Sequence, residues 1–193
     1  MASVLRITEH GKTRDGIETI ALESARLARM LENLFAVTRF SPETSVRRDW
    51  IPVDDVVGAA LGRLEDELRG REIVLELEPP VVAHADPILL ELLLVNLIDN
   101  AARHTPAGTP IEISARRDNV VVVIELADRG PGIPPGVFDR PIGAARGLGF
   151  EICRGIADAH GGAVMAWSRD GGGSALLVTI PDAAPMPNVE LER

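Results

Sequence analysis

The sequence predicts an α+β fold, a two-layer sandwich in which helices cover one face of a β-sheet. The main observation is the order of elements. From residue 53 onward, each segment of helical periodicity is followed by two short segments suited to strands. A second observation is the apolar share of 46%, which is ample for a packed core. The length of 193 residues suits one domain of ordinary size, or a small domain with an appendage.

The N-terminal part predicts a long helix. Apolar positions recur at helical spacing from about Arg14 to Phe40, and such a stripe needs a partner surface in this chain or in a second copy. A homodimer through this helix is therefore one expectation. Proline disfavours helix in the residue before it, so Ser41-Pro42 ends the helix, and we expect a linker at about residues 40–48. The chain then divides into a helical part with its linker, a main domain and a frayed tail, at residues 1–45, 46–182 and 183–193.

The main domain predicts three helices and six strands. The helices are at Val53–Arg69, at the segment opened by Asp86 and Pro87 as N-cap and first-turn residue, and at Phe150–His160. The strands are at Arg71–Glu78, Val81–His84, Ile111–Arg117, Val120–Asp128, Ala163–Ser168 and Ala175–Ile180. A two-residue turn at Asp118-Asn119 is expected to join the third and fourth strands.

The central helix reads ELLLVNLIDNAARHTP and combines an apolar stripe with unusual polar residues. The stripe consists of Leu90, Leu93, Leu94, Leu97, Ile98 and Ala101. The polar residues off the stripe are Glu91, Asn96, Asn100, Arg103 and His104. Amide and carboxylate oxygens can hold a hydrated divalent cation, and the arginine can meet phosphate. A solvated polar helix face is the alternative reading of this segment alone.

Three glycine-bearing loops follow. DRGPGIP begins at Asp128, where an acidic group can accept a hydrogen bond from an exocyclic amine such as that of adenine. RGLGFEICRGI places Gly147 and Gly149 at a helix start, where free amides suit phosphate. DGGGSALLVTI leads into a strand. Taken singly, the first and third loops are better explained as ordinary turns, and the second is equally an ordinary glycine-rich helix start.

Composition narrows the function classes. The net charge of −9 argues against a general nucleic-acid binder. The single cysteine, Cys153, excludes an internal disulfide and fits a reducing cytosol, in a helical context that suggests a buried small residue. We find neither a secretory signal nor an apolar run long enough to cross a bilayer, and we expect a soluble, cytoplasmic chain.

In combination, these motifs closely resemble the ATP-binding catalytic domain of sensor histidine kinases, within the wider Bergerat-fold (GHKL) ATPases. ELLLVNLIDNAARHTP resembles the family's N box, DRGPGIP its first glycine box and RGLGFEICRGIADAHGG its second. The resemblance covers about Trp50 to Pro181. Within the family, the motifs are similar to those of KdpD-type kinases, which sense potassium or turgor. It implies a mixed sheet with helices on one face, with ATP and Mg²⁺ as cofactors.

The resemblance also implies a role for each matching residue. Asn96 and Asn100 would hold Mg²⁺, and Asp128 would read the adenine amine. Thr179 would reach the adenine through water. The catalytic residues would be Glu91, which polarises the incoming nucleophile, with Asn96 and Arg103. The nucleotide-binding residues would be Asn96, Asn100, Arg103, His104, Asp128, Gly130, Gly132, Ile133, Gly147, Leu148, Gly149 and Thr179.

The sequence departs from the family pattern at two places. Residues 26–43 resemble the second helix of the dimerisation hairpin, but no phosphoacceptor box precedes them, and His10 does not match one. The lid between Phe138 and Gly147 is short, which predicts weaker nucleotide retention. We therefore expect an ATP-dependent protein histidine kinase that phosphorylates a histidine on a separate phosphoacceptor domain. The resemblance further implies a response regulator as partner and full-length relatives that are often membrane-attached. The alternative is a degenerate kinase or anti-sigma-like module that binds a partner protein.

Overall fold

The computed structural model describes residues 46–77, 81–133 and 148–182, with Leu148 described by its backbone only. The chain divides into two compact units, Met1–Arg39 and Phe40–Arg193, and every described residue belongs to the second. The predicted N-terminal helix, the short lid and the frayed tail lie outside the described residues and stay predictions.

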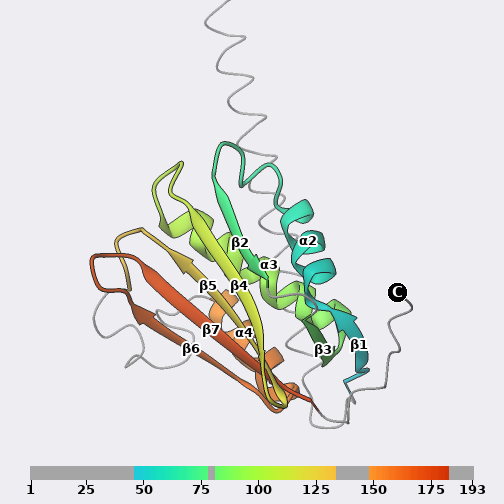
Figure 1. The fold of residues 1–193 in the computed structure, drawn as a ribbon. Helices are drawn as coiled ribbons and strands as arrows, with labels where there is room; N and C mark the ends of the chain where they lie inside the picture. Colours follow the sequence, from blue (N-terminus) through green and yellow to red (C-terminus); the bar gives the residue numbers. More distant parts are fainter. Residues whose placement is uncertain (1–45, 78–80, 134–147, 183–193) are drawn as a thin grey trace, which may run out of the picture. The chain divides into compact units, whose positions relative to one another are not determined.

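A five-stranded mixed sheet forms one layer of the second unit (Figure 1). The strand order is β2-β4-β5-β7-β6, with β2 and β4 parallel and the other neighbours antiparallel. The parallel pair needs a long crossover connection, which β3 and α3 provide. The strands are β2 (Ile73–Leu77), β4 (Ile111–Asp118), β5 (Val121–Asp128), β6 (Ala163–Ser168) and β7 (Ser174–Pro181). The mixed sheet implied by the resemblance is therefore confirmed.

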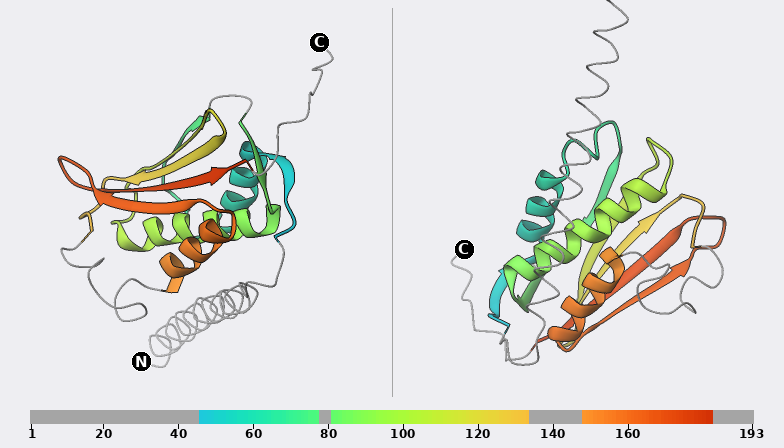
Figure 2. Two further views of the ribbon diagram at one scale, coloured as in Figure 1. Left: turned by 90° about the horizontal axis from the view of Figure 1, so that it is seen from below. Right: turned by 180° about the vertical axis from the view of Figure 1, so that it is seen from behind.

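Helices α2 (Val53–Arg63), α3 (Pro87–His104) and α4 (Leu148–Ala159) form the second layer. In Figure 2, α3 and α4 lie against the same face of the sheet, and all three helices contribute to one apolar core. Alternate residues of the strands face that core, as the period of two along a strand requires. On β4, β5 and β7 they are Ile111, Ile113, Ala115, Val122, Ile124, Leu126, Leu176, Val178 and Ile180. The predicted two-layer α+β fold with helices on one face is confirmed.

A separate two-stranded antiparallel sheet joins β1 (Asp49–Pro52) to β3 (Val82–Ala85). Trp50 stacks on His84 with ring centroids 4.8 Å apart, and the Arg117 guanidinium lies 6.0 Å from the centre of the Trp50 ring. The sequence did not predict β1, because its four residues show no clear alternation and form a strand by pairing with β3.

Helix α2 is shorter than predicted. The predicted range was Val53–Arg69, but the helix ends at Arg63 and turns follow as far as Gly70. The backbone N–H of Leu64 bonds the carbonyl of Leu61 at 3.1 Å, which is a three-residue step that ends the regular α-helical ladder.

The hairpin turn between β4 and β5 lies one residue later than predicted. Asp118 pairs with Val121, so the loop consists of Asn119 and Val120. Asn119 has a φ of 55°, in the left-handed region that asparagine tolerates better than most residues.

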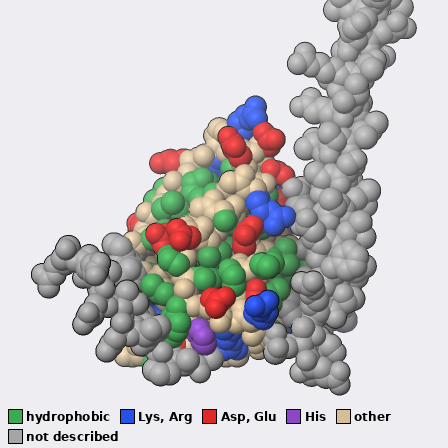
Figure 3. Space-filling model, turned by 90° about the vertical axis from the view of Figure 1, so that its right-hand side faces the viewer, with side chains coloured by type: hydrophobic (Ala, Val, Ile, Leu, Met, Phe, Trp, Pro, Cys, Tyr) green, Lys and Arg blue, Asp and Glu red, His purple; other side chains and the backbone are tan. Residues whose placement is uncertain are grey.

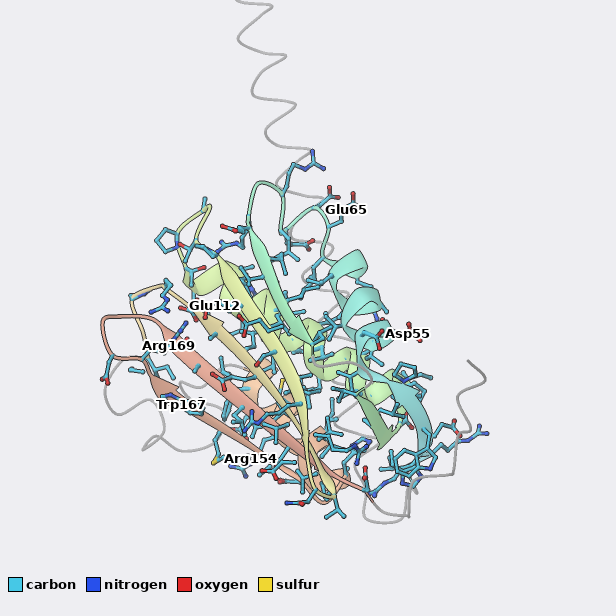
Figure 4. The ribbon with its side chains drawn as sticks, viewed as in Figure 1. Asp55, Glu65, Glu112, Arg154, Trp167 and Arg169 are labelled. Carbon is cyan, nitrogen blue, oxygen red and sulfur yellow. The ribbon has the colours of Figure 1, made fainter. Side chains whose placement is uncertain are left out.

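The solvent side of α2 carries charges that favour the helix. Asp54 and Asp55 lie in the first turn and Arg63 in the last, where each sign complements the helix dipole. Figure 4 labels Asp55 on this side, and Figure 3 shows a neighbouring face on which acidic, basic and apolar side chains are interspersed. No helix in the described part of the chain is long and apolar enough to span a bilayer.

Candidate nucleotide-binding site

The central helix α3 is fixed at both of its ends and along one face. The Asp86 side chain caps it by accepting hydrogen bonds from the N–H groups of Ile88 and Leu89, at 3.1 and 3.2 Å. Pro87 occupies the first turn, where its missing N–H costs nothing. Every residue of the predicted apolar stripe is buried, which anchors the helix and directs its polar residues toward one side.

The predicted polar residues of α3 differ in exposure. Asn96 is 8% exposed, and its Nδ2 donates to the Leu92 carbonyl at 2.8 Å, which fixes how the amide is turned. Asn100 is half-buried, whereas Arg103 and His104 are exposed at the C-terminal end. The polar side of α3 is therefore not simply a solvated surface, because the Asn96 amide is buried.

Two predicted catalytic side chains take part in ion pairs. Glu91 meets Arg63 of α2 at 3.3 Å, and both side chains remain partly exposed. Arg103 forms a hydrogen-bonded ion pair with Asp99, whose side chain is only 4% exposed. The Arg103 cation is thus already held by a buried carboxylate on the preceding turn of the same helix.

Asp128, at the end of β5, is buried, and both of its carboxylate oxygens accept hydrogen bonds. Its Oδ1 accepts hydrogen bonds from the backbone N–H of Gly130 at 2.7 Å and of Ser174 at 3.3 Å. Its Oδ2 accepts a hydrogen bond from the Ser174 hydroxyl. These donors join the first glycine loop and the start of β7 to one carboxylate, which fixes the orientation of that carboxylate.

The glycines around Asp128 are required by close approach. A Cβ at Gly130 would lie 2.5 Å from Cγ2 of Thr105, which ends α3. At Gly173, where φ is +99°, a Cβ would overlap the Asp128 carbonyl oxygen. Gly132 also has a positive φ, of 78°. The N–H of the next residue, Ile133, donates to the Ser168 hydroxyl at 3.1 Å. The loop can close on Asp128 only without side chains at these points.

The second glycine box meets the N box. Gly149 lies in the first turn of α4, and a Cβ there would be 3.2 Å from Oδ1 of Asn96. The box therefore adjoins the amide oxygen that the sequence assigns to Mg²⁺. Gly147 lies outside the described residues, and of Leu148 only the backbone is described.

Thr179 does not lie beside Asp128 in the sheet. It pairs with Val123, whereas Asp128 lies five residues further along β5. The Thr179 hydroxyl instead accepts a hydrogen bond from the Ala163 N–H at 3.0 Å, on the neighbouring strand β6. By strand alternation its side chain lies on the face opposite the core residues Val178 and Ile180.

Ser174 is the residue that sequence reasoning missed. It follows the glycine turn directly and bonds Asp128 through both its N–H and its hydroxyl. A hydroxyl at the first position after DGGG was the available signal, but the segment was interpreted only as a turn leading into a strand.

Outside the motifs, Arg169 supports the same loop from the sheet side. It follows β6 and donates to the Asp128 carbonyl at 3.3 Å and to Glu112 at 3.0 Å (Figure 4). Arg129 also pairs with Glu112, at 3.3 Å. The hydrogen bond from Arg169, together with both cations, lowers the pKa of Glu112 below its usual value despite partial burial.

Among the described residues, the candidate metal ligands on α3 are amide oxygens. Within the described ranges, His, Cys, Asp and Glu side chains form no group of three or more that could hold a metal ion. Asn96 fits an oxygen donor, because its Nδ2 is committed to Leu92 and its Oδ1 faces the space that Gly149 leaves.

The model of the histidine kinase-, DNA gyrase B- and HSP90-like ATPase family matches residues 85–184, just over half of the chain. The chain belongs to this ATPase family. The matched range contains the N box and both glycine boxes, so the resemblance inferred from these motifs is confirmed.

A named relative agrees with this assignment. The sensor protein KdpD of Escherichia coli is 34% identical over 184 residues, covering 89% of this chain and 20% of KdpD. The chain thus spans about a fifth of that relative's length. The expected similarity to KdpD-type kinases is confirmed.

Solved structures support the fold. The histidine kinase AdeS of Acinetobacter baumannii superposes with a TM-score of 0.71 at 24% identity, covering 87% of this chain and 84% of AdeS. The histidine kinase ThkA in complex with response regulator TrrA gives a TM-score of 0.68 at 22% identity, covering 82% of this chain and 48% of ThkA. At these identities the likeness establishes the two-layer architecture.

Proposed function

We propose that this chain is the ATP-binding catalytic part of a two-component sensor histidine kinase, acting on a phosphoacceptor histidine outside the described residues. The observation that carries the proposal is the meeting of three motifs at one helix. Gly149 adjoins Asn96 near the middle of α3, and Gly130 adjoins Thr105 at its end. A phosphate side and a base side, about two and a half helical turns apart, suit a nucleotide.

The base side would select adenine through Asp128. A carboxylate held by Gly130 and Ser174 has no freedom to turn, so it can accept a hydrogen bond from an exocyclic amine at a fixed position. The Gly130 and Gly132 backbone would lie along the base, with Ile133 beside it. Ser174 replaces Thr179 in this proposal, because Ser174 contacts Asp128 directly.

The phosphate side would be built from α3 and the start of α4. Asn96 and Asn100 would hold Mg²⁺, which neutralises phosphate charge during transfer. Arg103 and His104 are exposed and could meet phosphate oxygens, with Gly147, Leu148 and Gly149 closing from the second box. Glu91 would orient the incoming histidine, and Arg63 positions that carboxylate from α2. A response regulator would then receive the phosphoryl group.

Calorimetric titration with ATP, with and without Mg²⁺, tests the proposal. Asn100→Ala should abolish the metal-dependent part of ATP binding while the fold is retained, and unchanged binding would contradict the site assignment. Thr179→Val is the matched control and should leave binding as it is. Phosphate transfer to an added hairpin domain with a phosphoacceptor histidine separates a kinase from the alternative, a partner-binding module.

A further inference from the structure

Arg71, which belongs to none of the motifs, ties together the end of α3 and the start of β4. Its guanidinium donates to the Thr109 carbonyl at 2.6 Å, the Thr105 hydroxyl at 2.7 Å and the Ala102 carbonyl at 3.1 Å. It also reaches the Thr105 carbonyl at 3.5 Å. The last carbonyls of a helix lack intrahelical partners and carry partial negative charge, so a cation here completes the helix end.

The Thr105 side chain is held in one orientation by two contacts. Its hydroxyl donates to the Ala101 carbonyl at 2.7 Å while accepting from Arg71 at the same distance. Because the hydroxyl is committed twice, the direction of the methyl group is also determined. Thr105 is 9% exposed, so this methyl group lies in the interior.

The methyl group of Thr105 supports the loop that holds Asp128. A Cβ at Gly130 would lie 2.5 Å from it, so backbone and methyl group are already in close contact. The N–H of Gly130 in turn donates to Asp128 at 2.7 Å. A continuous series of contacts therefore leads from Arg71 through Thr105 and Gly130 to the carboxylate.

We propose that Arg71 is a positioning residue of the base site, acting on Asp128 through Thr105 and Gly130. The inference rests on the proposed function and adds to it a determinant of base selectivity. Its effect should be larger on the base side than at Asn96, since Thr105 lies roughly 14 Å along the helix axis from Asn96, at 1.5 Å per residue. Loss of Arg71 frees Thr105 to rotate, and the Gly130 loop and the Asp128 carboxylate then lose their fixed position.

The test compares ATP and GTP affinities, because a loosened base site should lose discrimination between them. Arg71→Met should weaken ATP binding by about tenfold and GTP binding by less than about twofold. Arg71→Lys, which keeps a donor, should recover part of the ATP affinity. Arg69→Met is the matched control, because Arg69 is highly exposed and pairs only locally with Asp66. Asn100→Ala provides the contrast, since it should weaken both nucleotides equally.

Two further variants keep the test decisive if Arg71→Met does not fold. Thr105→Ser keeps the hydroxyl and removes the methyl group, and Thr105→Val keeps the shape and removes the hydroxyl. Each variant should lower the ratio of the ATP affinity to the GTP affinity. An unchanged ratio in a folded Arg71 or Thr105 variant, or an equal loss for both nucleotides, would overturn the inference. Failure of the unmodified chain to bind ATP would overturn the proposed function itself, and the inference with it.

Discussion

Single residues hold the Asp128 carboxylate in the orientation that its proposed contact with adenine requires. Ser174→Ala removes the hydroxyl that donates to Oδ2 and leaves the backbone donors of Oδ1 in place. Hydrogen bonds to charged groups contribute about 1.5–3 kcal/mol, so we expect ATP binding to weaken by about tenfold or more. Titration of the variant with ATP measures this. Equal affinities of Ser174→Ala and the unmodified protein would show that Asp128 is held without the hydroxyl.

The ion pair between Arg103 and Asp99 is expected to contribute to folding stability. Asp99 Oδ1 is buried without a hydrogen-bond partner among the described residues, so Arg103 is the main compensation for this carboxylate. Arg103→Met should lower the free energy of unfolding by roughly 1–3 kcal/mol, and adding Asp99→Asn should restore part of it. Denaturant unfolding of both singles and the double measures the coupling. Additive effects would show that the pair contributes no coupling to stability.

At the scale of elements, the turn before β7 determines how closely this strand approaches β5. Gly173→Ala would drive a methyl group into the Asp128 carbonyl, and the backbone there has a φ of +99°. Gly171→Ala has a similar backbone penalty, at φ +83°, but meets nothing within 4 Å. We expect Gly171→Ala to cost about 1 kcal/mol of folding stability and Gly173→Ala several times more. Chemical unfolding compares the two, and equal costs would mean that the strand can shift to accept the methyl group.

The elements also show what sequence patterns can and cannot predict. Helix α3 was predictable because cap, first-turn proline and apolar period all coincide within one segment. Strand β1 was not, since it depends on its pairing with β3, whose residues are at least thirty positions away. The same applies to the site: local motifs were enough to predict roles for Asn96 and Asp128, but the contact of Arg71 with Thr105 spans 34 residues. Strand register, rather than motif order, decides which hydroxyl lies beside Asp128, and it is that of Ser174 rather than that of Thr179.

At the scale of the whole molecule, His160 joins α3 and α4, the two helices that carry Asn96 and Gly149. Its Nε2 accepts a hydrogen bond from the Asp86 N–H, at the N-cap of α3, at 3.0 Å. Its Nδ1 lies 2.8 Å from the Ile156 carbonyl in α4 and donates to it when the ring is neutral. A protonated ring could not accept the bond from Asp86, so the neutral form holds the helices together.

This arrangement predicts how stability depends on pH. Burial lowers the pKa of His160, and the Arg48 cation adds to this, while the Ile156 carbonyl and the Asp86 carboxylate oppose it. The unfolded chain, with a histidine pKa of about 6.5, then binds the proton at a higher pH than the native protein does. His160 therefore contributes its full stability above about pH 6.5, and that contribution falls as the pH drops from there toward the native pKa.

His160→Gln removes this titration while offering an amide to the same neighbours. Between pH 7 and about pH 5, the unmodified protein should lose stability more steeply than the variant, with a difference in slope of at most about 1.4 kcal/mol per pH unit. Denaturant unfolding across this range measures both slopes. Parallel curves would mean that the pKa of His160 does not differ between the native protein and the unfolded chain. A steeper curve for the unmodified protein would show that mild acid weakens the His160 hydrogen bonds that link α3 to α4. The spacing of Asn96 and Gly149, which lie on these two helices, would then also depend on pH.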